Sequence, residues 1–153
     1  MMDPKLWQDY LRLLEQLTKT IHQLTGIEQS KTRAASQGNL EELENCMRQE
    51  QAMSLSLRGH DQKRDALLAR MGLTGVPLRE LERHAPVDLL METKRVAETL
   101  RREYGLFQTA SQVARNTLEC NLRMIEKARA QLEGEAPPPG ENGDQPSQYE
   151  LRV

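Results

Sequence analysis

The side chains of this chain that could carry chemistry are its three histidines and two cysteines, and they are dispersed along the sequence. None of His22, His60 and His84 stands near a cysteine at the spacing of a zinc site. The sequence holds no glycine-rich phosphate loop and no serine or cysteine in a known nucleophile motif. His60 falls within an apolar helical pattern, where a structural histidine is the expected interpretation. We therefore predict no enzyme activity, no catalytic residue, no metal site and no cofactor.

The two cysteines, Cys46 and Cys120, are too few and too far apart to form a disulfide framework. Both lie near apolar positions, which favours buried, reduced thiols. No apolar run is long enough to cross a membrane, and the first residues lack the pattern of a secretory signal. We expect a cytoplasmic protein without stable membrane insertion.

The composition is typical of long helices that have one face in water. Charged residues make up 29% of the chain, hydrophobic residues 37% and aromatic residues 3%, so the core must be aliphatic and thin. The net charge is −2, and the basic residues are spread along the chain. This distribution offers no basic stripe for nucleic acid and no polybasic block for a lipid surface, so we expect neither as a partner.

Apolar residues recur from the N-terminus at alternating steps of three and four, which is the seven-residue repeat of helices that pack side by side. Asp3 and Pro4 open this stretch, because Asp is a good N-cap and Pro is tolerated in the first turn. The expected buried stripe consists of Trp7, Tyr10, Leu14, Leu17, Ile21 and Leu24. The stripe weakens where Glu28 and Lys31 occupy its next two positions.

Gly38 and Asn39 predict a turn, after which a second helix runs from about Leu40 to Met71, antiparallel to the first. Polar residues interrupt the apolar seam of this helix. Glu50 and Arg64 could face each other, face solvent or mark a place where the bundle opens, and the sequence leaves these alternatives open.

A loop with Gly72, Gly75 and Pro77 separates the second helix from a short helical segment at Leu78 to His84. The longest helix is then predicted to begin at Pro86 and to continue to Leu132. At 1.5 Å per residue it would reach roughly 65–70 Å, against roughly 45–50 Å for each of the other two. Its end must be covered by a second copy, by a partner or by the C-terminal segment, or else it is a docking surface.

These patterns predict an all-α fold, an elongated antiparallel helical bundle or coiled-coil hairpin of three long helices with a short connecting helix. Residues 1–133 form the helical domain. Residues 134–153 are acidic and rich in Pro and Gly, a composition that cannot build a core, and are predicted to be a disordered tail.

The later part of the longest helix mixes apolar residues with small and amide ones. Small residues allow two helices to approach closely, and an amide can form a hydrogen bond across an interface and fix its register. This stretch could form a groove for a partner helix or could pack on the first helix of the same chain. Both interpretations remain open from the residues alone.

Several segments resemble the FlgN family of flagellar export chaperones, over roughly residues 6–132. Residues 38–43 are similar to the turn between the first two helices of the family. The stretch from residues 49–51 to 63–68, ending in residues 71–73, is similar to its second helix and the glycine that follows. Residues 115–122 resemble the asparagine-containing stretch late in its long helix, and a polar tail with a tyrosine, here Tyr149, also recurs.

The resemblance implies a cytoplasmic export chaperone that binds the amphipathic C-terminal helix of the hook-associated proteins at the hook–filament junction. Such a chaperone prevents premature assembly and delivers its cargo to the type III export machinery. On this basis the predicted cargo surface comprises Val113, Ala114, Thr117, Leu118, Asn121, Leu122 and Ile125. The alternative is a structural coiled-coil scaffold protein with a permanent helical partner, which includes a homodimer.

Overall fold

The structure is a computed structural model that describes residues 3–134, and every element in that range is helical. Helix α1 spans Pro4–Gln37, α2 spans Leu40–Arg70 and α3 spans Leu90–Glu133. Two short 3-10 helices, η1 at Leu78–His84 and η2 at Val87–Leu89, connect α2 to α3. The predicted all-α class is therefore confirmed for this part of the chain. Apart from Gly134, the tail predicted at residues 134–153 lies outside the described residues.

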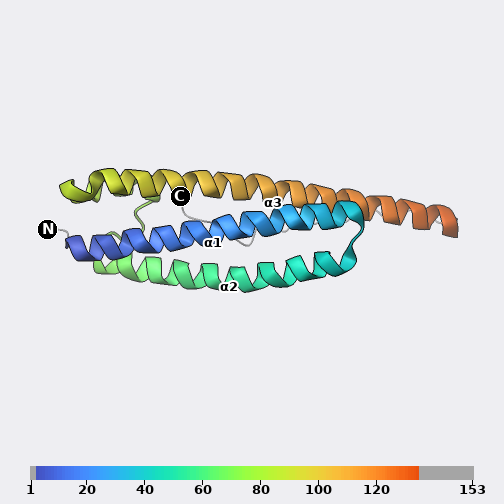
Figure 1. The fold of residues 1–153 in the computed structure, drawn as a ribbon, viewed down its shortest axis with the longest axis horizontal. Helices are drawn as coiled ribbons and strands as arrows, with labels where there is room; N and C mark the ends of the chain where they lie inside the picture. Colours follow the sequence, from blue (N-terminus) through green and yellow to red (C-terminus); the bar gives the residue numbers. More distant parts are fainter. Residues whose placement is uncertain (1–2, 135–153) are drawn as a thin grey trace.

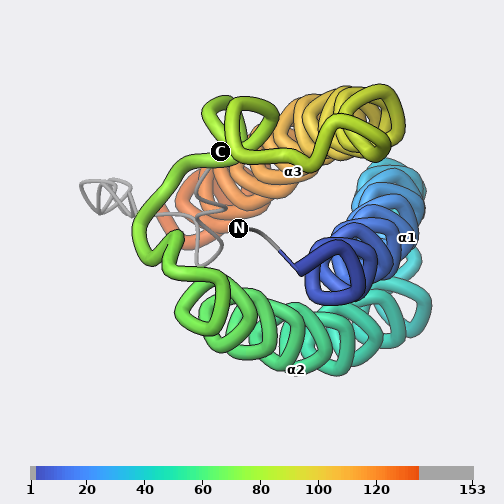
Figure 2. Tube along the Cα trace, turned by 90° about the vertical axis from the view of Figure 1, so that its left-hand side faces the viewer, coloured from blue at the N-terminus to red at the C-terminus, as the bar shows by residue number. Residues whose placement is uncertain are grey.

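Helix α1 lies between the other two long helices and packs against both of them (Figure 1). The chain reverses after α1, so α2 runs back beside it to the end at which α1 begins. The connection through η1 and η2 stays at that end and leads into α3. Helix α3 therefore runs in the same direction as α1 and continues past the turn between α1 and α2. The view along the helices shows α2 and α3 on different sides of α1 (Figure 2).

The ends of α1 are fixed by capping residues that are recognisable in the sequence. Oδ1 of Asp3 accepts a hydrogen bond from the backbone N–H of Lys5 (3.0 Å), and Pro4 occupies the first helical position, where its missing N–H is not needed. Gly38 has a φ of 67°, and the N–H of Asn39 donates to the carbonyl of Ala34 (2.9 Å). This left-handed C-cap ends α1 and lets the chain turn at once into α2.

Helix α2 begins directly after Asn39, which the turn places in position to cap it. Oδ1 of Asn39 accepts a hydrogen bond from the N–H of Glu42 (3.1 Å), and Glu41 and Glu42 stand in the first turn, where negative charge favours the helix dipole. The helix ends in the same manner as α1. Gly72 has a φ of 72°, and the N–H of Leu73 donates to the carbonyl of Leu68 (2.8 Å).

The core is densest at the end of the bundle where α1 begins. The predicted stripe of α1 is confirmed, because its six residues are each at most 1% exposed: Trp7, Tyr10, Leu14, Leu17, Ile21 and Leu24. Nε1 of Trp7 donates to Oγ1 of Thr93 (2.8 Å), which joins α1 to α3 inside the core. The connecting segment contributes Leu78 and Leu81, each 1% exposed, to the same core.

Packing becomes sparser and more polar towards the turn between α1 and α2. Of the side chains buried on α2, Cys46 lies near the turn, whereas Leu57, Arg64 and Leu68 lie in the other half of the helix. The residues buried near the end of α1 are Glu28 and the small Ala34 and Ala35. Small and charged side chains bury less apolar area than leucines do, and apolar burial supplies most of the stabilisation. This end of the bundle is therefore held more weakly than the other.

The start of α3 differs slightly from the prediction. Pro86 precedes η2, and the α-helix itself begins four residues later, at Leu90. The N–H of Leu89 donates to the carbonyl of Pro86 (2.9 Å), the tighter bond of a 3-10 turn. Tighter turns of this kind are frequent at helix N-termini, so the proline does initiate helical structure.

Candidate partner-binding surface

The seven residues predicted to bind a partner do not form one exposed surface. Ala114 is 1% exposed and belongs to the interior. Nδ2 of Asn121 donates to the carbonyl of Ala35 on α1 (2.6 Å), and Oγ1 of Thr117 donates to the carbonyl of Val113 within α3 (2.9 Å). The bond from Asn121 to Ala35 attaches this part of α3 to α1. This agrees with the interpretation that the stretch packs on the first helix of the same chain.

The remaining members of the predicted set differ in exposure. Leu118 and Thr117 are half-buried, whereas Val113 is 47%, Leu122 56% and Ile125 64% exposed. The two members beyond Asn121, Leu122 and Ile125, are therefore the most exposed of the set. The most accessible part of the predicted surface lies at the C-terminal end of α3.

The end of α3 carries apolar side chains in water. Beyond Asn121 the exposed large apolar residues are Leu122, Met124, Ile125 and Leu132, and we call these four the α3-end surface. Ile125 and Leu132 continue the seven-residue frame of Phe107 and Ala114, both of which are buried. The apolar repeat of α3 thus continues beyond the level at which α1 ends, at Gln37. Helix α3 therefore projects past its neighbours (Figure 1).

A cluster of three charged side chains lies between α1 and α2. Nζ of Lys31 donates to Oε2 of Glu50 (2.8 Å) and lies 3.5 Å from Oε2 of Glu28. Glu28 is 3% exposed. Two carboxylates thus share one ammonium group in a largely buried layer, and a proton on one carboxyl would complete the balance of charge.

The pKa values of the two carboxyl groups move in opposite directions. Burial, together with the neighbouring Glu50, raises the pKa of Glu28 to about 7 against the opposing effect of Lys31. Burial alone would raise the pKa of Glu50, but hydrogen bonds with Glu28 and Lys31 outweigh it and lower that pKa. As the pH falls, Glu28 is therefore the carboxyl that takes up a proton first, while Glu50 remains the anion that pairs with Lys31.

Two further polar pairs join α1 to α2. Nε of Arg64 donates to the hydroxyl of Tyr10 (3.3 Å), and Nε2 of His60 lies 3.1 Å from Oγ1 of Thr20. Burial lowers the pKa of His60, and the neighbouring Lys63 lowers it further. Arg64 and Glu50 thus do not face each other, because each bonds to a different residue of α1. His60 has the structural environment that the sequence suggested.

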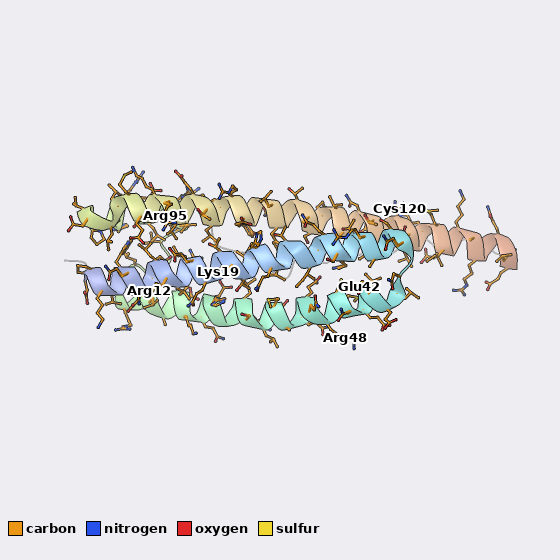
Figure 3. The ribbon with its side chains drawn as sticks, viewed as in Figure 1. Arg12, Lys19, Glu42, Arg48, Arg95 and Cys120 are labelled. Carbon is orange, nitrogen blue, oxygen red and sulfur yellow. The ribbon has the colours of Figure 1, made fainter. Side chains whose placement is uncertain are left out.

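The two cysteines have different environments. Cys46 is 1% exposed, and burial together with Glu42 raises the pKa of its thiol. Cys120 is exposed on α3 (Figure 3). Both are free thiols, but the prediction that both are buried is wrong for Cys120, because the helix turns it away from α1.

Cys120 is expected to react with a neutral thiol reagent in the native protein at least about tenfold faster than Cys46, because a reagent needs access and a thiolate. The reaction can be followed by the absorbance of the released thiol product. Cys120→Ser should remove the fast phase, and the slow phase should become fast in denaturant. A fast phase that persists in Cys120→Ser would contradict the burial of Cys46.

Within residues 3–134, no group of three or more His, Cys, Asp or Glu side chains is placed to hold a metal ion. None of the helices in this range combines the length with the apolar character that a membrane crossing requires. The chain matches no protein-family model, no curated protein and no solved structure.

Proposed function

We propose that this chain is a cytoplasmic, non-enzymatic export chaperone of the FlgN type. It binds the amphipathic C-terminal helix of a hook-associated protein of the hook–filament junction, prevents premature assembly and delivers its cargo to the type III export apparatus. The observation that carries the proposal is the α3-end surface, where large apolar side chains at helical spacing remain in water. The resemblance of residues 38–43, 63–73 and 115–122 to that family supports it.

The mechanism is the temporary covering of one apolar helix face by another. A cargo helix laid along α3 would bury Leu122, Ile125 and Leu132 together with its own apolar stripe. The segment from Asn121 to Glu133 is about 18 Å long at 1.5 Å per residue, so the contact is short. Burying a few leucine-sized side chains at about 1.5–3 kcal/mol each, against an association cost of at least about 4 kcal/mol, gives modest affinity. Modest affinity suits a cargo that must be released.

In the proposed mechanism, α1 and α2 support α3. In it, the elongated antiparallel bundle, with α1 and α2 as a coiled-coil hairpin, holds the start of α3 rigid while its end remains available. The dense core around Trp7 and Thr93, far along α3 from Ile125, supports this division of labour.

The double substitution Leu122→Glu and Ile125→Glu is expected to weaken cargo binding at least about tenfold, because two carboxylates would have to be buried against an apolar stripe. The measurement is calorimetric titration with a peptide of the C-terminal helix of a junction protein. The unsubstituted chain should bind one peptide per chain with a negative heat-capacity change, the sign of apolar burial.

The matched control is Val87→Glu with Met91→Glu, two apolar residues, in η2 and in the first turn of α3, that are 89% and 78% exposed. This variant should bind the peptide as the unsubstituted chain does, and circular dichroism should show equal helix content in all three proteins. Equal binding by the Leu122→Glu, Ile125→Glu protein would overturn the choice of surface. No binding of any junction peptide to the folded chain would overturn the chaperone function itself.

A permanent coiled-coil partner is the second candidate function, favoured by the continuation of the seven-residue frame to Leu132. Such a protein would form an obligate dimer or complex through the α3-end surface. Sedimentation velocity distinguishes the two functions, because a scaffold of this kind remains dimeric at low concentration and ignores junction peptides.

A further inference from the structure

Two open hollows of about 370 and 710 Å³ lie between α1 and α2. The first lies between residues 9–16 of α1 and 63–70 of α2, and the second between residues 23–33 and 49–53. Among the described residues that line them, none belongs to α3. We call the two hollows together the α1–α2 groove.

Basic side chains make up most of the charged residues that line this groove. Four of them line the hollows, two from each helix: Arg12, Arg33, Lys63 and Arg70. Lys5 and Lys19 stand seven residues from Arg12 on either side, and therefore on the same face of α1. Of the described residues lining the hollows, Asp9 is the one carboxylate, and it lies 3.7 Å from Arg12. The basic residues that look dispersed in the sequence are thus aligned by the fold.

The floor of the groove is apolar and its walls include small residues. Apolar side chains line it in both hollows: Leu13, Ile27, Met53 and Leu67. Gly26 of α1 and Ala52 of α2 both line the second hollow. A Cβ atom added to Gly26 would meet nothing within 4 Å, so the packing of α1 on α2 does not require glycine there. The small residues leave room for another backbone to approach closely.

We propose that the α1–α2 groove binds an amphipathic helix of a partner protein whose apolar stripe is flanked by carboxylates. The apolar floor matches the stripe, and the basic rim matches the flanking charges. Charges seven residues apart on α1 lie about 10.5 Å from one another, the same repeat as carboxylates at one heptad position of a helix packed alongside. A phosphate backbone would use the basic rim and leave the floor unused.

The size of the groove fits a helix of ordinary length. From Arg12 to Arg33 α1 rises about 32 Å, which corresponds to a partner helix of about 21 residues. The groove and the α3-end surface belong to different helices. The inference therefore stands without the proposed export function, and each can fail while the other holds.

The test is the fluorescence anisotropy of a labelled designed peptide of about 21 residues, with Leu at the a and d positions and Glu at the e and g positions of its heptads. Binding should be weaker at about 300 mM than at about 50 mM NaCl, because salt screens the rim charges. Arg12→Glu with Lys63→Glu should weaken binding at least about tenfold. Gly26→Leu, which leaves the charge unchanged and fills the second hollow, should weaken it by a similar factor.

The matched control is Lys94→Glu with Arg102→Glu, two exposed residues of α3 that give the same change in net charge. It should bind as the unsubstituted chain does, and a peptide of the same composition in scrambled order should bind at least about tenfold more weakly. Equal binding of the scrambled peptide would overturn the proposal, because charge alone would then account for the attraction. So would an RNA oligonucleotide or phosphatidylserine vesicles that bind more tightly than the peptide and lose binding in Arg12→Glu, Lys63→Glu.

Discussion

Replacing Trp7 with alanine is expected to lower the free energy of unfolding by about 3–5 kcal/mol, a large part of the total for a domain of this size. Trp7 is 0% exposed, its ring centre lies 5.9 Å from that of Tyr10, and its Nε1 donates to Thr93. The truncation would leave a cavity where α1, α3 and η1 meet. Urea denaturation followed by far-ultraviolet circular dichroism measures the change.

Two further variants show whether burial is the cause. Trp7→Phe keeps most of the ring volume and loses the hydrogen bond, so it should destabilise less than Trp7→Ala; Thr93 still donates to the carbonyl of Leu89 (2.7 Å). Leu132→Ala removes a side chain that is 89% exposed and should change the free energy by at most about 0.5 kcal/mol. Similar losses in Trp7→Ala and Leu132→Ala would show that the core is not centred on α1.

The course of α1 and of the turn after it was predictable because independent signals agree there. Asp3 and Pro4 mark the start, Gly38 and Asn39 mark the end, and the apolar stripe between them keeps one frame. Each signal has its own physical cause, in capping, in backbone freedom and in burial, so an accidental agreement of all three is rare. The same reasoning located the ends of α2 within one residue.

The seam of α2 was not predictable from the apolar pattern. Glu50 and Arg64 look like defects in the sequence, yet each bonds to a residue of α1, at Lys31 and Tyr10. The partner of Arg64 is 54 residues away, and a periodicity within one helix carries no information about it. The available signal in the sequence was that Lys31 and Glu50 carry opposite charges at seam positions of two helices predicted to be antiparallel neighbours.

The accessible part of the candidate site depended on where α1 stops. Ala114 and Ile125 occupy the same seven-residue frame, but one is 1% and the other 64% exposed. A frame predicts which face of a helix is apolar, while burial also requires a neighbour at that level. The basic residues of the α1–α2 groove were not predicted for a related reason. They look dispersed along the sequence, but residues seven apart lie on one face of a helix.

Glu28→Gln is expected to stabilise the protein by between about 1 and 3 kcal/mol at about pH 8.5 and to have little effect at about pH 5. Burial raises the pKa of Glu28 to about 7 from an ordinary value of 4.5. A carboxyl with a raised pKa binds its proton more tightly in the folded state. Its contribution to stability is therefore fully present below pH 4.5 and is lost as the pH rises through about 7. Urea denaturation at both pH values measures the difference.

The lowered pKa of Glu50 acts in the opposite direction, because its contribution is present above its ordinary pKa and is lost in acid. The comparison of Glu28→Gln with the unsubstituted chain at one pH is a difference in the free energy of unfolding. In this difference the contribution of Glu50 cancels in part, and the contributions of distant groups such as His60 cancel. Glu98→Gln, at an exposed position of α3, is the matched control and should show no such pH-dependent gain. If Glu28→Gln were destabilising by the same amount at both pH values, Glu28 would be an anion held by Lys31 throughout. The layer would then be an ordinary ion pair rather than two carboxyl groups that share a proton.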